Sequence, residues 1–208
     1  VEAHNELNNK NVKFGISPFG IWRNKSQDPL GSNSQGLSSY SAQYADTYKW
    51  IKEGWLHYVM PQLYWEFNHS TARFADLVDW WVDVVKDTDV DLIIGHGFYR
   101  YAETSNNWKD QNELLEQLRY ISQYEEIKGS SFFSYKTLNS THLFVTQAIE
   151  RLNGFFWKQR ADYPWESQVE APVDPIDPGN PTDPGNPIDP GNPTDPGNPT
   201  DPKEKVDT

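Results

Sequence analysis

Four short apolar runs of the chain are followed by aromatic and hydrogen-bonding residues of the kind that bind sugars. The runs span residues 12–21, 58–64, 92–98 and 130–135. The candidate binding residues at or just beyond their ends are Trp22, Arg23, Gln62, Tyr64, Trp65, His96, Tyr99 and Tyr135. A sugar ring offers an apolar C–H face to an aromatic plane and hydroxyls to polar groups at its edge. Any single aromatic could equally pack against the core, but the set as a whole favours carbohydrate as the ligand class.

Glu66 is the carboxylate that lies closest to the end of such a run. Glycoside hydrolysis ordinarily needs two carboxyl groups, one to protonate the leaving oxygen and one to act as nucleophile or general base. Asp28 and Glu103 stand further from their runs, and no acid lies close to the end of the fourth. Glu66 is therefore the candidate catalytic acid or base. Its structural alternative is a loop carboxylate that pairs with Arg23 or caps the following helix.

His96 stands between two glycines at the end of the third run. It could bind a hydroxyl, hydrogen-bond Glu66 or act as a base, and a satisfied structural histidine is an equal alternative. The chain has no Cys and no second His at metal-ligand spacing. Asp79, Asp83 and Asp87 recur at one-turn intervals, which indicates a solvated helix face. We therefore expect neither a metal nor a cofactor.

Segments with helical periodicity separate the four apolar runs. Apolar residues recur at helical spacing over residues 44–55, 74–85, 114–121 and 143–156. Strands that alternate with helices indicate an α/β fold with a parallel sheet and right-handed crossovers. No Gly-x-Gly-x-x-Gly turn follows a run, so a (β/α)8 TIM barrel is favoured over a dinucleotide-binding sheet. Because a complete barrel needs about 250 residues and eight strands, we expect only about four βα units here.

Composition divides the chain into two parts. Residues 1–165 are expected to form the half barrel, and residues 166–208 are expected to be a linker. The unit Gly-Asn-Pro-Xaa-Asp-Pro occurs four times in succession from Gly179 to Pro202. Frequent proline removes backbone donors and fixes φ, so this tail should be an extended or disordered spacer. Residues 1–10 indicate the end of an amphipathic helix, from which we expect the chain to begin inside a longer protein.

Charge and hydropathy exclude two classes of partner. Residues 171–208 carry eight acidic residues against two lysines, which accounts for six of the twelve net negative charges. The remainder is mildly acidic and has no Lys or Arg cluster suited to nucleic acid. No run of about 18 apolar residues could span a bilayer. We expect neither a nucleic-acid partner nor a membrane span.

Three segments resemble the glycosyl hydrolase-like 10 family: VKFGISPFGIWR at residues 12–23, KEGW at 52–55 and YVMPQLYWE at 58–66. The resemblance runs from about residue 1 to about residue 160. It implies a secreted or envelope-attached bacterial TIM barrel, in a family that includes a hydrolase of peptidoglycan glycan strands. It also implies that SPFGIWR belongs to the fifth strand, so that this chain carries strands five to eight. The Asp-rich segment that follows the fourth strand in the family has no counterpart here.

Two functions are consistent with this sequence. The first is a glycoside hydrolase acting on a bacterial cell-envelope polysaccharide, with peptidoglycan glycan strands as the candidate substrate and this chain as a fragment of the enzyme. The second is a non-catalytic carbohydrate-binding or surface-display protein. In either case we expect a secreted, cell-surface or cell-wall location and a further wall-binding module beyond the linker. A half barrel also leaves open sheet edges, through which two copies could pair.

Overall fold

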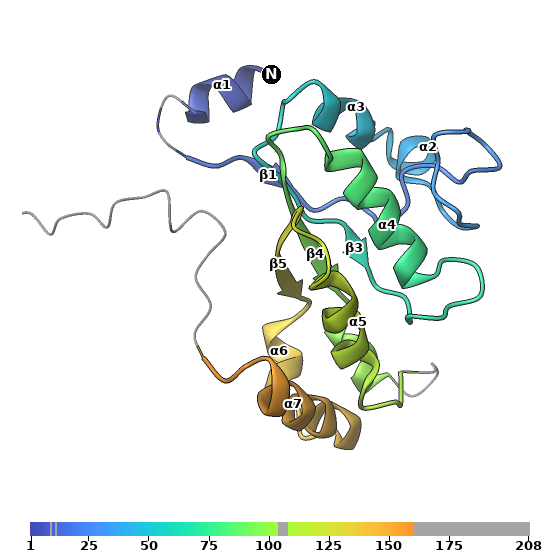
Figure 1. The fold of residues 1–208 in the computed structure, drawn as a ribbon, viewed down its shortest axis with the longest axis vertical. Helices are drawn as coiled ribbons and strands as arrows, with labels where there is room; N and C mark the ends of the chain where they lie inside the picture. The colour runs from blue at the N-terminus through green and yellow to red at the C-terminus, as the bar shows by residue number, and fades with distance from the viewer. Residues whose placement is uncertain (9, 11, 104–107, 160–208) are drawn as a thin grey trace, which may run out of the picture. The chain divides into compact units, whose positions relative to one another are not determined.

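The computed structural model describes residues 1–8, 10, 12–103 and 108–159 (Figure 1). The elements in chain order are α1 (Glu2–Asn8), β1 (Gly15–Ile16), α2 (Ser39–Gln43), α3 (Thr47–Lys52), β2 (Tyr58–Val59), β3 (Gln62–Leu63), α4 (Phe74–Val85), β4 (Asp91–His96), the 3-10 helix η1 (Phe98–Ala102), α5 (Glu113–Ile121), β5 (Ile127–Phe132), α6 (Tyr135–Leu138) and α7 (Leu143–Phe155). The predicted domain boundary near residue 165 and the repeat tail lie outside the described residues. Within the described part of the chain, no helix is long and apolar enough to cross a membrane.

Every strand pairing of the sheet is parallel, which confirms the predicted α/β class. β1 pairs with β2, both β2 and β3 pair with β4, and β4 pairs with β5. Val59 lies opposite Leu92 and Gln62 lies opposite Gly95, so β2 and β3 keep one register against β4. The break between them falls at Pro61, which has no N–H to donate. The sheet and its helices are consistent with a TIM-barrel-like fold.

The fourth strand begins and ends three residues earlier in the sequence than predicted. We expected a strand over residues 130–135, whereas β5 runs from Ile127 to Phe132 and Tyr135 begins α6. β5 contains Lys128, Gly129 and two serines between its terminal apolar residues, so most of the strand has little apolar signal. Pairing with β4 holds it in the sheet, since Ile94 and Gly95 of β4 lie opposite its two serines.

Helix α4 supplies much of the core beneath the sheet. Its apolar residues recur at helical spacing, and Phe74, Leu77 and Trp81 are fully buried. Burial of each such side chain contributes about 1.5–3 kcal/mol. On the opposite face Asp79 and Asp83 are exposed, as predicted, whereas the predicted third residue of that stripe, Asp87, lies beyond the end of the helix.

The helix predicted over residues 44–55 is present only in part, because α3 occupies Thr47–Lys52 and the residues before it close the separate helix α2. Tyr44 caps the end of α2, and its backbone is left-handed with φ 53°. α3 then begins after Asp46, whose carboxylate accepts a hydrogen bond of 3.3 Å from the Lys49 N–H. An aspartate in this position caps the free N–H groups of a new helix, so the polar residue between the apolar ones marks a start rather than a helix interior.

We predict that Gly95→Ala destabilises the fold. A Cβ at Gly95 would stand 2.7 Å from the Pro61 carbonyl oxygen, and this oxygen accepts a hydrogen bond from the Gly95 N–H. Backbone cannot move aside as a flexible side chain can, so we expect a loss of about 1–3 kcal/mol in the free energy of unfolding. Urea unfolding followed by tryptophan fluorescence measures it.

The matched control is Gly154→Ala in α7, where a Cβ would meet no atom within 4 Å. Because alanine favours a helix over glycine, this variant should be as stable as the wild type or up to about 1 kcal/mol more stable. Equal stability of both variants would contradict the packing at Gly95.

Candidate functional site

Three aromatic rings gather where β3, β4 and β5 end. Tyr64 lies 5.8 Å from Tyr99 and 6.0 Å from Phe133 between ring centroids, and Tyr99 lies 5.9 Å from Phe133. A backbone hydrogen bond of 2.9 Å from the Tyr99 N–H to the Phe133 carbonyl ties two of these strand ends together. Phe133 is 57% exposed, so this aromatic cluster presents an apolar plane to solvent. Burial, followed by the nearby Tyr99, raises the pKa of Tyr64.

Gln62 and Trp65 lie on the same edge of the sheet as the aromatic cluster. The Gln62 amide donates a hydrogen bond of 3.0 Å to the Ser17 carbonyl, which joins the end of β3 to the chain that follows β1. The Trp65 ring packs edge-on against Phe19 at 5.4 Å. Both side chains remain half-buried, so each has a surface left for a ligand.

Glu66 follows this group on the loop between β3 and α4. Its backbone carbonyl accepts hydrogen bonds from the N–H groups of His69 (3.1 Å) and Phe74 (3.4 Å), which fold the loop onto the start of α4. Arg23, the partner that the structural alternative suggested, is paired with Asp28 at 2.8 Å instead. Within the described residues no hydrogen bond or ion pair engages the half-buried Glu66 carboxylate. The group is thus available to a substrate.

A buried chain of hydrogen bonds lies behind this loop. Glu113 accepts from the Phe67 N–H at 2.6 Å and from the Gln117 amide at 2.8 Å. The same Gln117 amide donates to the Trp65 carbonyl at 3.1 Å, and its oxygen lies 2.8 Å from Nδ1 of His96. Two residues of α5 therefore hold the backbone on both sides of Glu66.

His96 continues this chain into the sheet. Its Nε2 lies 3.2 Å from the Ser130 hydroxyl of β5, and its ring is stacked between Phe74 and Phe132. The residue is fully buried, and burial lowers its pKa to about 4 against a smaller opposing effect of the Gln117 hydrogen bond. His96 therefore lies in the core, which is the structural alternative that the sequence left open, and it is not exposed to a ligand in the described structure.

Glu113 carries a carboxyl group whose pKa is shifted by its surroundings. Its pKa is raised, first by burial and in part by the nearby charges of Glu66 and Asp110, although hydrogen bonds from Gln117 and Phe67 work in the opposite direction. The Oε1 atom of Glu113 accepts hydrogen bonds from two donors within the protein, so Glu113 positions the loop that carries Glu66.

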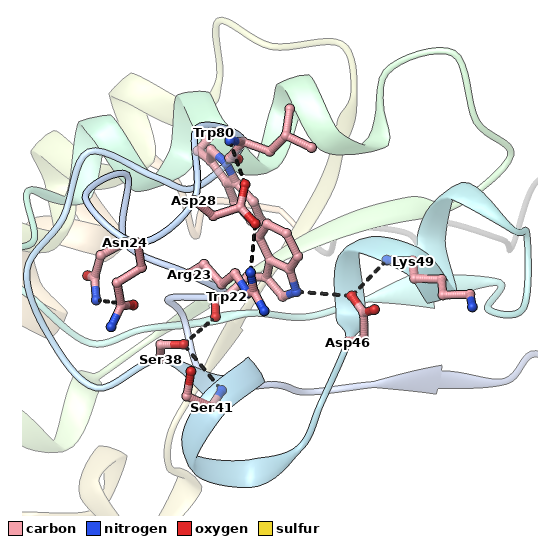
Figure 2. Close-up of polar contacts among 11 residues, drawn as sticks. Trp22, Arg23, Asn24, Asp28, Ser38, Ser41, Asp46, Lys49 and Trp80 are labelled. Carbon is pink, nitrogen blue, oxygen red and sulfur yellow. Dashed lines mark hydrogen bonds and ion pairs between the residues drawn. The ribbon is translucent and has the colours of Figure 1, made fainter.

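Trp22 and Arg23 hold the long loop after β1 in place. Figure 2 shows the Trp22 indole donating to Asp46 and the Arg23 guanidinium paired with Asp28. Trp22 is only 5% exposed and stacks on Trp80, while the Arg23 guanidinium lies 3.5 Å from the ring centroid of Tyr40. Both side chains are thus engaged within the protein.

Tyr135 lies apart from the aromatic cluster in its contacts. It begins α6 and is 77% exposed. Phe133, two residues earlier, takes the place that the sequence gave to Tyr135, because β5 ends at Phe132. A strand prediction that ended three residues sooner would have identified Phe133. No sequence pattern pointed to Glu113 and Gln117 as parts of the site, because polar residues on a helix are ordinarily solvated.

No group of three or more His, Asp or Glu side chains within the described ranges is arranged to hold a metal ion. Two of the acids that follow strand ends, Asp28 and Glu103, are instead engaged with cations. Asp28 pairs with Arg23, and Glu103 pairs with Arg100 at 3.1 Å. The Leu30 N–H is the largest cause that lowers the pKa of Asp28; burial opposes it, and the Arg23 guanidinium adds to the lowering.

In TIM-barrel enzymes the active site lies at the carboxyl ends of the parallel strands, and the aromatic cluster and Glu66 follow strand ends in this sheet. Residues 8–112 match the family described as Glycosyl hydrolase-like 10, and the chain belongs to that family. It is 44% identical over 147 residues to glycosyl hydrolase DigH of Escherichia coli (strain K12), a match that covers 68% of this chain and 33% of that protein. It is 43% identical over 140 residues to glycosyl hydrolase YngK of Bacillus subtilis (strain 168), covering 66% of this chain and 28% of that protein. The chain thus spans about a third of the length of these relatives.

The buried His96 should make stability depend on pH. A histidine whose pKa is lower in the folded chain than in the unfolded chain takes up its proton on unfolding. Its contribution is therefore complete above the unfolded pKa of 6.5 and is lost as the pH falls toward its folded pKa of about 4. Within that window we expect unfolding free energy to fall by about 1.4 kcal/mol per pH unit from this group.

Urea unfolding at about pH 7, pH 6 and pH 5 measures this slope in the wild type and in His96→Gln. Burial also lowers the pKa of His57, which adds to the slope in both proteins, so the difference between them isolates His96. Identical slopes would show that His96 does not titrate as a buried group.

Proposed function

We propose that this chain is part of a glycoside hydrolase that acts on a bacterial cell-envelope polysaccharide. In this proposal its sheet supplies strands five to eight of a (β/α)8 barrel, and the other strands come from elsewhere in the intact protein. The parallel sheet, the family and the match to about a third of two glycosyl hydrolases support this arrangement. The names of the relatives support the reaction class.

The observation that carries the proposal is the unengaged Glu66 carboxylate beside a sugar-binding edge. Tyr64, two residues earlier, belongs to the aromatic cluster, and Gln62 offers an amide at the same strand end. A sugar stacked on this cluster would bring its glycosidic oxygen toward the Glu66 loop. There Glu66 would donate a proton to the leaving oxygen, or as a carboxylate it would accept one from water.

The second carboxyl group that hydrolysis requires would come from another part of the intact protein. Asp28 and Glu103, the other acids that follow strand ends, are paired with Arg23 and Arg100. Such pairing keeps a carboxylate in place and away from a reacting sugar. In a complete barrel the separation between Glu66 and the second carboxylate would decide whether configuration is retained or inverted.

We extend the proposal to substrate and location. Peptidoglycan glycan strands are the candidate substrate, and the protein would be secreted or held at the cell surface or wall. The Gly-Asn-Pro-Xaa-Asp-Pro repeat would act as a spacer between the barrel and a wall-binding module. Proline at every third position suits a spacer, because it narrows the range of backbone conformations that the segment can adopt.

Glu66→Gln should abolish most of the hydrolysis in the full-length gene product. Glutamine keeps the size and shape of the side chain but cannot transfer a proton, so we expect a loss of about 10²–10⁴-fold in kcat. Release of new reducing ends from purified glycan strands measures it. The matched control is Glu116→Gln, an exposed residue that pairs with Arg119 on the outer helix α5. Loss of activity in both variants, or in neither, would remove Glu66 from the mechanism.

A non-catalytic glycan-binding protein is the second candidate, and the pairing of Asp28 and Glu103 favours it for this chain on its own. Both candidates require the aromatic cluster. Phe133→Ala should weaken binding of chitotetraose to the chain by about 3–10-fold, because one stacking plane is lost. Isothermal titration calorimetry measures the dissociation constant.

The control for this binding experiment is Phe155→Ala. Phe155 is 53% exposed on α7, much like Phe133, but belongs to a different part of the structure. We expect its substitution to leave the affinity unchanged. Equal weakening by both substitutions would mean that the aromatic cluster is not the binding surface.

A further inference from the structure

A polar groove of about 510 Å³ lies apart from the aromatic cluster, between the two long loops that follow β1 and β3. The first loop lines it with residues 24–26 and 33–36. The second loop and the first turn of α4 line it with Ser70, Thr71, Arg73 and Asp76. This volume lies within the range of small-molecule sites. The second loop also carries Glu66, so the groove and the candidate catalytic group share one segment of chain.

The wall formed by the first loop is held rigidly by Asn24. This side chain is 5% exposed, and its oxygen accepts hydrogen bonds of 3.0 Å from the Gly36 N–H and from the Ser34 hydroxyl. Its amide donates to the Gly36 carbonyl at 2.9 Å. The two walls are joined by a backbone hydrogen bond of 2.7 Å from Gln35 to Thr71. The groove is therefore preformed, which lowers the entropic cost of binding.

The groove has an excess of positive charge. Lys25 and Arg73 contribute two cations, and Asp76 contributes one carboxylate. Asp76 is engaged on both oxygens, by the Asn33 amide at 2.8 Å and by Arg73 at 3.7 Å. Within the described residues no hydrogen bond or ion pair engages the ammonium of Lys25. The amino end of the twelve-residue helix α4 adds a partial positive charge to the same wall.

We propose that this groove is a subsite for a sugar unit that carries a carboxylate. The hydroxyl and amide groups of the walls suit sugar hydroxyls, and Lys25 with Arg73 suits a carboxylate, because an ion pair with hydrogen bonds is stronger than either contact alone. The groove has no aromatic lining, so it selects by charge where the aromatic cluster selects by stacking. This inference rests on the proposed function, since it adds a specificity site to the same glycan.

The test compares two tetrasaccharides that differ in their carboxylates. One is an alternating N-acetylglucosamine and N-acetylmuramic acid tetrasaccharide with free lactyl carboxylates, and the other is chitotetraose, which has none. Isothermal titration calorimetry on the full chain should show the acidic tetrasaccharide binding about 3–10-fold more tightly at low salt. Lys25→Gln and Arg73→Gln should each reduce this preference, and the double variant should abolish it.

Two further variants make the result specific. Lys86→Gln removes a cation just beyond the opposite end of α4, outside the groove, and should keep the full preference. Asp76→Asn removes the competing carboxylate and should increase the preference by about 2–5-fold. Circular dichroism of each variant checks that the fold is kept.

The outcomes distinguish the groove as a carboxylate subsite from the proposed glycoside hydrolase function. Equal affinity for both tetrasaccharides, or a preference that survives the double substitution, overturns the groove as a carboxylate subsite while leaving the proposed function in place. Failure to bind either tetrasaccharide overturns both. A preference that is lost equally in Lys86→Gln would assign the effect to net charge and would also overturn the subsite.

Discussion

The buried hydrogen bonds of His96 connect the sheet to the loop on which the candidate chemistry depends. The imidazole joins Ser130 of β5 to Gln117 of α5, and Gln117 with Glu113 then holds the backbone beside Glu66. Inside a protein such a chain is favourable only when every member has a partner, since an unpaired buried polar group costs about 1–3 kcal/mol. Satisfying the chain therefore fixes the loop, the helix and two strands in one arrangement.

The residues at the carboxyl edge of the sheet fall into two groups, those engaged within the protein and those open to a ligand. Trp22 and Arg23 are occupied by Asp46, Asp28 and neighbouring rings, and so they shape the loop after β1. Glu66 and the exposed side of the aromatic cluster are left for a ligand. A strand end with one unengaged acid supplies half of what glycoside hydrolysis needs. In the proposed enzyme the complementary half of the site would belong to other strands of the barrel, and the chain covers only 33% of the length of DigH.

Features with a strong local pattern were predictable from the sequence, and features created by long-range contacts were not. The apolar period of α4 and the parallel class of the sheet are confirmed. The helix predicted over 44–55 is shortened to α3 because Asp46 caps its start. The last strand was misplaced because its residues are held by pairing with β4 rather than by hydrophobicity. Gln117 looks like a solvated helix residue until His96 is placed beside it, 21 positions away in sequence.

The most direct test of the proposed reaction is to follow the oxygen that cleavage adds to the glycan. The full-length gene product would be incubated with purified glycan strands in oxygen-18-labelled water, and the products analysed by mass spectrometry. Hydrolysis through an acid and a carboxylate predicts new reducing ends that each carry one labelled oxygen. Strands that remain bound and uncut, or that are cut without incorporating label, would contradict a glycoside hydrolase and leave the site as a glycan-binding surface or one of different chemistry.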